Sequence, residues 1–334
     1  AKLFNNSKNK LFLSGSHRFD MMLSKFNNYW NNSNLDRKKI TISGNFNLIN
    51  GYTNKDKIIS ELNKQGYFSR SEIYKDELIN ILDDTEKKFK EFFKMIRYII
   101  ERFPDETFHL RPHPLEKIET WKNEFSNFKN VNVSKKGNIN EQLVNSKILI
   151  HNSCTTAFHS YFYGIPTISY EPIVCKSDYG QPANELSERT KKVEELCNLI
   201  STILENKYTI SNKNYKDDLF SNKVFRPKNN YSAEIIVNEW KKISNFSNEN
   251  QINLRKIKYV LFINEIINNL RKITIKIIKP FKKLHSDKKF EDLSEIEVTN
   301  KIKKIQKILN IRSEIVVKKI ANKCFFLKKN DKND

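Results

Sequence analysis

Strand-like and helix-like hydrophobic patterns alternate along residues 38–245. Short apolar runs rich in β-branched and aromatic residues predict strands over 38–46, 107–114, 131–135, 147–152 and 166–172. Between these runs, apolar residues recur at helical spacing over about 72–102, 115–128, 140–146, 155–163 and 185–206. The run at 147–152 lacks polar alternation, as expected when helices cover both faces of a parallel sheet. The pattern therefore predicts an α/β fold, a Rossmann-like parallel sheet with helical crossovers.

The segments on either side of this α/β region have different patterns. Residues 1–37 predict a short strand at Lys10–Ser14, a turn and a helix-like stretch. Residues 246–334 show no convincing strand and predict two basic amphipathic helices, the first ended or kinked at Pro280 and the second over about 294–321. We therefore expect three parts: a leading segment over 1–37, an α/β domain over 38–245 and a basic helical tail over 246–334.

Most of the excess positive charge lies in that tail. Residues 251–334 hold about 22 Lys and Arg against about 9 Asp and Glu, so roughly +13 of the net charge of +21 lies there. Proteins that bind nucleic acid more often carry such charge on the folded module, and we expect no nucleic-acid partner. Two interpretations of the tail stay open: it binds an anionic membrane surface, or it packs on the α/β domain and keeps a solvated cationic face.

Other features of composition exclude further classes. The cysteines show neither CxxC spacing nor a metal-ligand pattern, which indicates reduced thiols and no metal; they are Cys154, Cys175, Cys197 and Cys324. No run approaches the ~18 apolar residues of a membrane span, and no signal peptide is visible. We expect a cytoplasmic protein, peripheral on the inner membrane if the tail binds lipid. The first residue is Ala1 rather than Met, which favours a truncated chain.

Polar residues gather at the predicted strand ends. Ligands of parallel sheets bind beyond the carboxyl ends of the strands, so the candidate site residues are Asn45, Arg111, His113, Pro114, Asn152, Ser153, Thr155, Thr156 and Glu171. A helix that begins near residue 155 would present N–H groups to an anion. Each residue alone is more often structural, because a single His usually packs and a Ser or Thr before a helix usually caps it. Their shared position favours a nucleotide held across several loops.

The chemistry of these residues suits the parts of a nucleotide. His113 can donate to a phosphate oxygen, and Pro114 fixes the exit from its strand. The hydroxyls after 152 add further donors, and Glu171 can accept from ribose hydroxyls, as acidic residues do in other nucleotide-binding sheets. His151 and His159 are instead expected to be packing residues.

Two motifs bear a family resemblance. The segments RPHP at 111–114 and GNINEQLVNSKILIHNSCTTAFHSYFYGIPTISYEP at 137–172 closely resemble bacterial surface carbohydrate (lipopolysaccharide or capsule) biosynthesis proteins. LSGSHRFDMML at 13–23 and ITISGNFNLIN at 40–50 are similar to further segments of that family. Its members resemble GT-B glycosyltransferases that use CMP-activated acidic sugars such as Kdo or sialic acid. The resemblance covers roughly residues 10–240.

The resemblance implies a role for each matching residue. His113, Pro114, Ser153, Thr155 and Thr156 would hold the donor phosphate, and Glu171 would contact the ribose; the α/β domain would be the C-terminal, nucleotide-sugar-binding half of a GT-B fold. Two positions depart from the pattern: Ser16-His17 replaces the usual Asn-Pro, and His159 replaces a common acidic residue.

The activity implied by the resemblance is glycosyl transfer from a nucleotide-activated sugar, CMP-linked by preference, to a glycan or lipid-linked acceptor. The acceptor site and catalytic base of such enzymes lie on an N-terminal domain that this chain is expected to lack, so we name no catalytic residue. Without a DxD-like motif near the site, we expect metal-independent transfer and no cofactor. The alternatives are a CDP-polyol phosphotransferase of similar fold and a fragment that binds a nucleotide-sugar without turnover.

Overall fold

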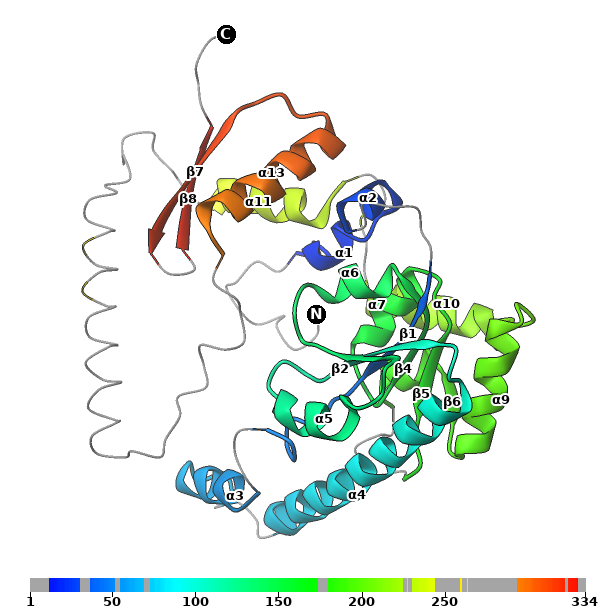
Figure 1. Cartoon of the computed structure of the whole chain (residues 1–334). Helices are drawn as coiled ribbons and strands as arrows, with labels where there is room; N and C mark the ends of the chain where they lie inside the picture. The colour runs from blue at the N-terminus through cyan, green and yellow to red at the C-terminus, as the bar shows by residue number, and fades with distance from the viewer. Residues whose placement is uncertain are drawn as a thin grey trace. The chain divides into compact units, whose positions relative to one another are not determined.

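A computed structural model describes residues 12–30, 37–51, 55–68, 73–173, 180–224, 227, 230–243, 259, 263, 293–321 and 324–329. The chain divides into two compact units, Ala1–Ile235 and Ile236–Asp334 (Figure 1). No helix in the described ranges combines the length and the apolar character needed to cross a membrane. The three-part division at 37/38 and 245/246 stays a prediction.

The first unit is built on a six-stranded parallel sheet (Figure 1). Its strands, in chain order, are β1 (Lys39–Ser43), β2 (Thr107–Arg111), β3 (Val131–Val133), β4 (Ser146–His151), β5 (Thr167–Tyr170) and β6 (Glu188–Thr190). Their spatial order is β3-β2-β1-β4-β5-β6, and every pairing is parallel. This order is the one found in doubly wound nucleotide-binding sheets. The predicted Rossmann-like α/β fold is therefore confirmed.

Helices cover both faces of the sheet. The helices of this unit are α1 (His17–Asp20), η2 (Ser24–Phe26), α2 (Asn27–Trp30), α3 (Lys55–Lys64), α4 (Ile73–Arg102), α5 (Ile118–Phe125), α6 (Ile139–Leu143), α7 (Thr156–Phe162), α8 (Pro182–Glu185), α9 (Val193–Leu204), α10 (Lys213–Lys223) and the start of α11 (Ser232–Ile243). Neighbouring residues of β4 show the two layers: Ile148 and Ile150 pack with α4, α5 and α9, whereas Leu149 packs with α6. Burial on both faces explains the unbroken apolar run.

The leading segment packs on α7 and α10 and contacts the start of α11. Phe19 lies 5.9 Å from Phe162 and 6.1 Å from Phe220, measured between ring centroids. The carboxylate of Asp20 accepts from the backbone N–H of Ser232 at 3.0 Å and of Ala233 at 2.8 Å. A carboxylate there satisfies free N–H groups of α11 and complements its dipole. The aromatic and acidic residues of the HRFD sequence thus have structural roles.

Several predicted elements need correction. The expected helix over 185–206 is wrong in its first part, where α8 is followed by β6 before α9 begins. β6 was missed because its sequence Glu-Arg-Thr is short and polar, whereas its pairing with β5 is set by the neighbouring strand. The predicted strand at Lys10–Ser14 is wrong for residues 12–14, which are not in a strand, while residues 10 and 11 lie outside the described residues.

The described part of the second unit contains α13 (Glu295–Leu309) and an antiparallel pair, β7 (Ile315–Ala321) and β8 (Cys324–Lys329). The expectations of no strand after 246 and of one helix over 294–321 are therefore wrong. The helix ends where Asn310 adopts a left-handed conformation, with φ of 55°, and the β-branched run that follows favours a strand. The predicted helix before Pro280 lies outside the described residues, except for Tyr259 and Ile263, which are helical.

Candidate functional site

The strand order creates a switch point between β1 and β4. From β1 the chain proceeds to β2 and β3 on one side, and from β4 it proceeds to β5 and β6 on the other. The loops that follow β1 and β4 therefore diverge, and ligands of open α/β sheets bind in the resulting crevice. Two of the predicted residues meet there, because Asn45 Nδ2 donates to the carbonyl oxygen of Ser153 at 3.3 Å.

The loop after β4 is held by α8 and the turn behind it. Ser153 adopts a left-handed conformation, with φ of 43°, which is uncommon for a residue with a side chain. Its Oγ accepts from Asn184 Nδ2 at 3.0 Å. The next backbone N–H, that of Cys154, donates to His151 Nδ1 at 3.2 Å, and His151 Nε2 lies 2.7 Å from Ser187 Oγ. Asn184 and Ser187 were not predicted; Pro182 at the first turn of α8 was the available signal.

The other two hydroxyl-bearing candidates, Thr155 and Thr156, come shortly after Ser153 in the sequence. Thr155 is exposed and precedes α7 without using its side chain as a cap. Thr156 Oγ1 is buried and makes no hydrogen bond to any described residue. A buried hydroxyl without a partner carries a desolvation cost of about 1–3 kcal/mol. Asn152, between the strand and Ser153, is 5% exposed. These residues form one continuous stretch beside the switch point.

A buried carboxylate ties the loops after β1 and β2 together. Glu116 is fully buried, and its Oε1 accepts from the backbone N–H of Phe46 and of His113, both at 3.0 Å. Its Oε2 accepts from Asn50 Nδ2 at 3.1 Å and from Trp121 Nε1 at 2.9 Å. Sequence reasoning missed Glu116, because a single Glu just before a helix resembles a solvated first-turn residue.

This arrangement fixes the orientation of His113, which is half-buried. Its Nδ1 accepts from the backbone N–H of Leu115 at 3.2 Å, so the neutral ring carries its proton on Nε2. Pro114 is exposed in the same turn. Close packing also explains the glycine after β1: a Cβ on Gly44 would lie 2.6 Å from Trp121 Cζ2. The segments that follow β1 and β2 are thus closely packed against each other.

Two other candidates have structural partners. Arg111 is 9% exposed, and its guanidinium donates to the carbonyl oxygens of Lys136 at 3.1 Å and Gly137 at 2.9 Å. Glu171 is also buried, and both of its oxygens accept from Arg189, at 3.0 and 2.6 Å. Arg111 holds the loop after β3, and Glu171 joins β5 to β6. The ribose contact predicted for Glu171 stays a prediction.

Three interior histidines are neutral in the folded state. Burial lowers the pKa of His151 to about 3. Burial, together with the charges of Arg111 and Lys39, lowers the pKa of His109 to about 4. Burial and Arg18 lower the pKa of His159 to about 4, and its Nδ1 lies 2.9 Å from Asn140 Oδ1. His151 is fully buried, as its interpretation as a packing residue requires.

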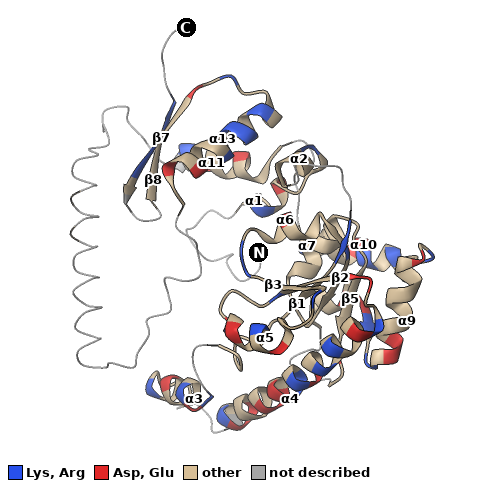
Figure 2. Cartoon of the chain, viewed as in Figure 1, with Lys and Arg blue, Asp and Glu red and all other residues tan. Residues whose placement is uncertain are grey.

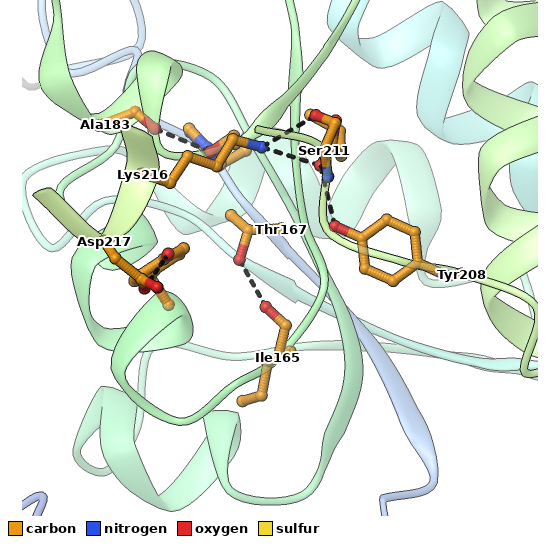
Figure 3. A network of polar contacts seen from close by, with 11 residues as sticks. Ile165, Thr167, Ala183, Tyr208, Ser211, Lys216 and Asp217 are labelled. Atoms are coloured by element: carbon orange, nitrogen blue, oxygen red, sulfur yellow. Dashed lines mark hydrogen bonds and ion pairs between the residues drawn. The ribbon is translucent and has the colours of Figure 1, made fainter. Parts of the chain in front are cut away.

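Figure 3 shows a polar network that joins α10 to the edge of the sheet. The Lys216 ammonium, 5% exposed, lies 2.8 Å from Glu188 Oε1, which also accepts from the Tyr208 hydroxyl at 3.0 Å. Burial raises the pKa of Glu188, but hydrogen bonds from Lys216 and Ser211 outweigh that effect and lower it below its usual value. The network supports β6 and with it the segment that carries α8.

A cavity of about 380 Å³ lies apart from the strand ends, lined by α4 residues such as Phe89 and Phe93 and by Glu124 of α5. It contains none of the predicted site residues. Within the described ranges, no three His, Cys, Asp or Glu side chains are grouped so as to hold a metal ion. Compared with known protein families and with curated proteins, the chain matches no family model and no curated protein.

Proposed function

We propose that this chain binds a nucleotide-activated sugar, CMP-linked by preference, at the switch point between β1 and β4, as the donor-binding half of a GT-B glycosyltransferase of surface polysaccharide biosynthesis. The acceptor would be a glycan or a lipid-linked saccharide. The observation that carries the proposal is the contact between Asn45 and Ser153, because it joins the two diverging loops where nucleotides bind in sheets of this order.

The proposed chemistry concerns the departing phosphate. As the glycosidic bond to the donor breaks, negative charge develops on the nucleotide phosphate. Hydroxyls of Ser153 and Thr155 and the Nε2–H of His113 would stabilise that charge, because preorganised donors are most effective where charge develops. The chain contributes donor binding, and the base that activates the acceptor is not assigned to any residue here.

Calorimetric titration with CMP tests the proposal. His113→Ala should reduce CMP affinity by about tenfold or more, the range for losing a hydrogen bond to a charged group. His17→Ala is the matched control, because His17 is exposed on α1 and belongs to no candidate site. Equal CMP affinity in wild type and His113→Ala would refute the role of His113. Absence of CMP binding by the wild-type chain would refute the function.

A donor screen separates the rival activities. CMP-Kdo and CMP-sialic acid represent the favoured donors, CDP-glycerol represents the polyol phosphotransferase, and UDP-sugars serve as mismatched donors. Binding of CDP-glycerol in preference to the CMP-sugars would favour phosphotransfer. Binding without release of CMP in the presence of acceptor would favour the non-catalytic alternative.

The same proposal includes a membrane role for the second unit. Lys303, Lys304 and Lys307 are exposed, and their spacing places them on one side of α13. None of the three forms an ion pair with a described residue. Figure 2 shows Lys and Arg segments along this helix. Such a cationic side suits anionic headgroups, which attract Lys by about 1 kcal/mol each. Replacing all three by Gln should weaken co-sedimentation with vesicles of phosphatidylcholine and phosphatidylglycerol. The same replacement at Lys122, Lys129 and Lys223, exposed in the first unit, is the control.

A further inference from the structure

His151 is the last residue of β4 and lies at the switch point of the sheet. It pairs with Ser43 of β1 on one side and with Ser169 of β5 on the other. The residue is fully buried. A polar ring at such a position needs hydrogen-bond partners within the protein, because water does not reach it.

Both ring nitrogens have such partners, and together these define the tautomer. Nδ1 accepts from the backbone N–H of Cys154 at 3.2 Å, so the neutral ring carries its hydrogen on Nε2. Nε2 lies 2.7 Å from Ser187 Oγ, and the Ser187 hydroxyl donates to the carbonyl oxygen of Ala183 at 2.8 Å. The Ser187 oxygen is therefore free to accept from Nε2–H. The hydrogen bonds run in one direction, from the loop after β4 through His151 to α8.

The ring holds a turn that has an uncommon backbone. Ser153 has a left-handed φ of 43°, a conformation that persists only where the surrounding contacts maintain it. The next residue, Cys154, is held at its N–H by His151 and at its side chain by β1, where its Sγ lies 3.7 Å from Ser43 Oγ. Thr155 follows directly and is exposed. The position of the Thr155 hydroxyl therefore depends on how Cys154 is anchored.

We infer that His151 is a positioning residue that, through its Nδ1 and the Cys154 N–H, places the Thr155 hydroxyl for the phosphate of the ligand. This inference rests on the proposed nucleotide site and adds to it an interior residue that the ligand does not touch. It gives the two ring nitrogens separate tasks. Nδ1 sets the turn beside the ligand, and Nε2 joins that turn to α8.

Two substitutions separate these tasks. His151→Asn brings an amide oxygen close to the position of Nδ1, where it can still accept from Cys154. His151→Gln brings an amide nitrogen close to the position of Nε2, where it can donate to Ser187 but offers Cys154 no acceptor. His151→Gln should weaken CMP binding about three- to tenfold, the range of one hydrogen bond, whereas His151→Asn should keep the wild-type affinity.

Two further readings distinguish positioning from a merely structural role. Cytidine lacks the phosphate, so both variants should bind it with the wild-type affinity. Each variant loses one buried hydrogen bond, so their urea midpoints should fall alike. If His151 only stabilised the fold, CMP affinity would follow stability and fall equally in both variants. The same two substitutions at His109, a buried histidine within β2 rather than at its end, are the matched control and should leave CMP affinity unchanged.

Nitrogen NMR of the isotope-labelled wild-type protein tests the inference without any substitution. CMP should shift the backbone amide signal of Cys154 and the ring Nδ1 signal of His151, because Thr155 adjoins this turn. Cytidine should shift both signals less, and the ring signals of His109 should stay in place. This measurement decides the matter if neither His151 variant folds.

The possible results separate the two claims. Equal CMP losses in the two His151 variants, unchanged CMP affinity in both, equal losses for CMP and cytidine, or His151 signals that CMP leaves in place would overturn the role of His151. CMP binding by the wild-type chain would leave the nucleotide site standing in each of these cases. A wild-type chain that binds neither CMP nor CDP would overturn the proposed function and this role with it.

Discussion

The substitution Glu116→Gln changes one atom of the buried carboxylate that joins the loops after β1 and β2. In the native protein, each carboxylate oxygen accepts two hydrogen bonds, Oε1 from Phe46 and His113 and Oε2 from Asn50 and Trp121. A glutamine oxygen can serve one pair, but its amide N–H₂ then faces the other two donors. Two hydrogen bonds are lost and two buried donors lose their partners, each at about 1–3 kcal/mol. We expect the free energy of unfolding to fall by about 2–6 kcal/mol.

Urea unfolding followed by tryptophan fluorescence measures that loss, and Trp121 reports locally because its Nε1 donates to Glu116. The midpoint should fall with an unchanged dependence on urea concentration, since the unfolded state exposes the same surface. Glu61→Gln is the control, because Glu61 is exposed on α3, and such a change usually stays within about 0.5 kcal/mol. If Glu116→Gln stayed within the same margin, the view of Glu116 as the link between the loops would be wrong.

Three further predictions concern stability. Lys216→Met leaves the Glu188 carboxylate without its buried cation and should cost about 3 kcal/mol; an unchanged urea midpoint would exclude a stabilising pair. The three interior histidines have folded-state pKa values well below the ordinary value of about 6.5. At pH values between the folded-state and the ordinary pKa, the unfolded chain therefore binds more protons than the folded chain. Their contribution to the free energy of unfolding is complete above pH ~6.5 and should fall by about 1 kcal/mol for each histidine between pH 7 and 5.5. The urea midpoint should therefore be lower at pH 5.5, and a constant midpoint would contradict the burial of these histidines. Asp20→Ala removes the acceptor at the start of α11 and should cost about 1 kcal/mol, and thermal unfolding of Asp20→Asn should show whether the charge contributes.

The strands buried on both faces were predictable from sequence. Runs such as Ile148–Ile150 are apolar without interruption, because a strand covered by helices on both faces has no side open to water for a polar side chain. β6 was not predictable in this way, because Glu188 and Arg189 are polar and the strand exists through its pairing with β5. For β7, the run Ile-Val-Val-Lys-Lys-Ile also fits helical spacing, and only the left-handed turn at Asn310 separates the two.

For the candidate site, too, only some of the residues could be predicted from the sequence. Residues that directly follow apolar strands, such as Asn45 and Ser153, could be predicted, and the structure places these two in contact. The residues that hold these loops in place could not be predicted. Glu116 and Asn184 act through their burial and through partners distant in sequence, 70 positions away for Phe46 and 31 for Ser153. Nothing in a single polar residue of a loop reveals such partners.

The contact between Asp20 and the start of α11 has a consequence for synthesis on the ribosome. Ser232 and Ala233 follow Asp20 by 212 and 213 positions in the sequence. At about 5–20 residues per second, they are therefore synthesised about 10–40 s after Asp20. The sheet strands emerge earlier, and β1 to β6 can pair while Phe19 still lacks Phe220. A nascent chain arrested before α10 would therefore present Phe19 without that partner, a segment suited to chaperone binding until translation resumes.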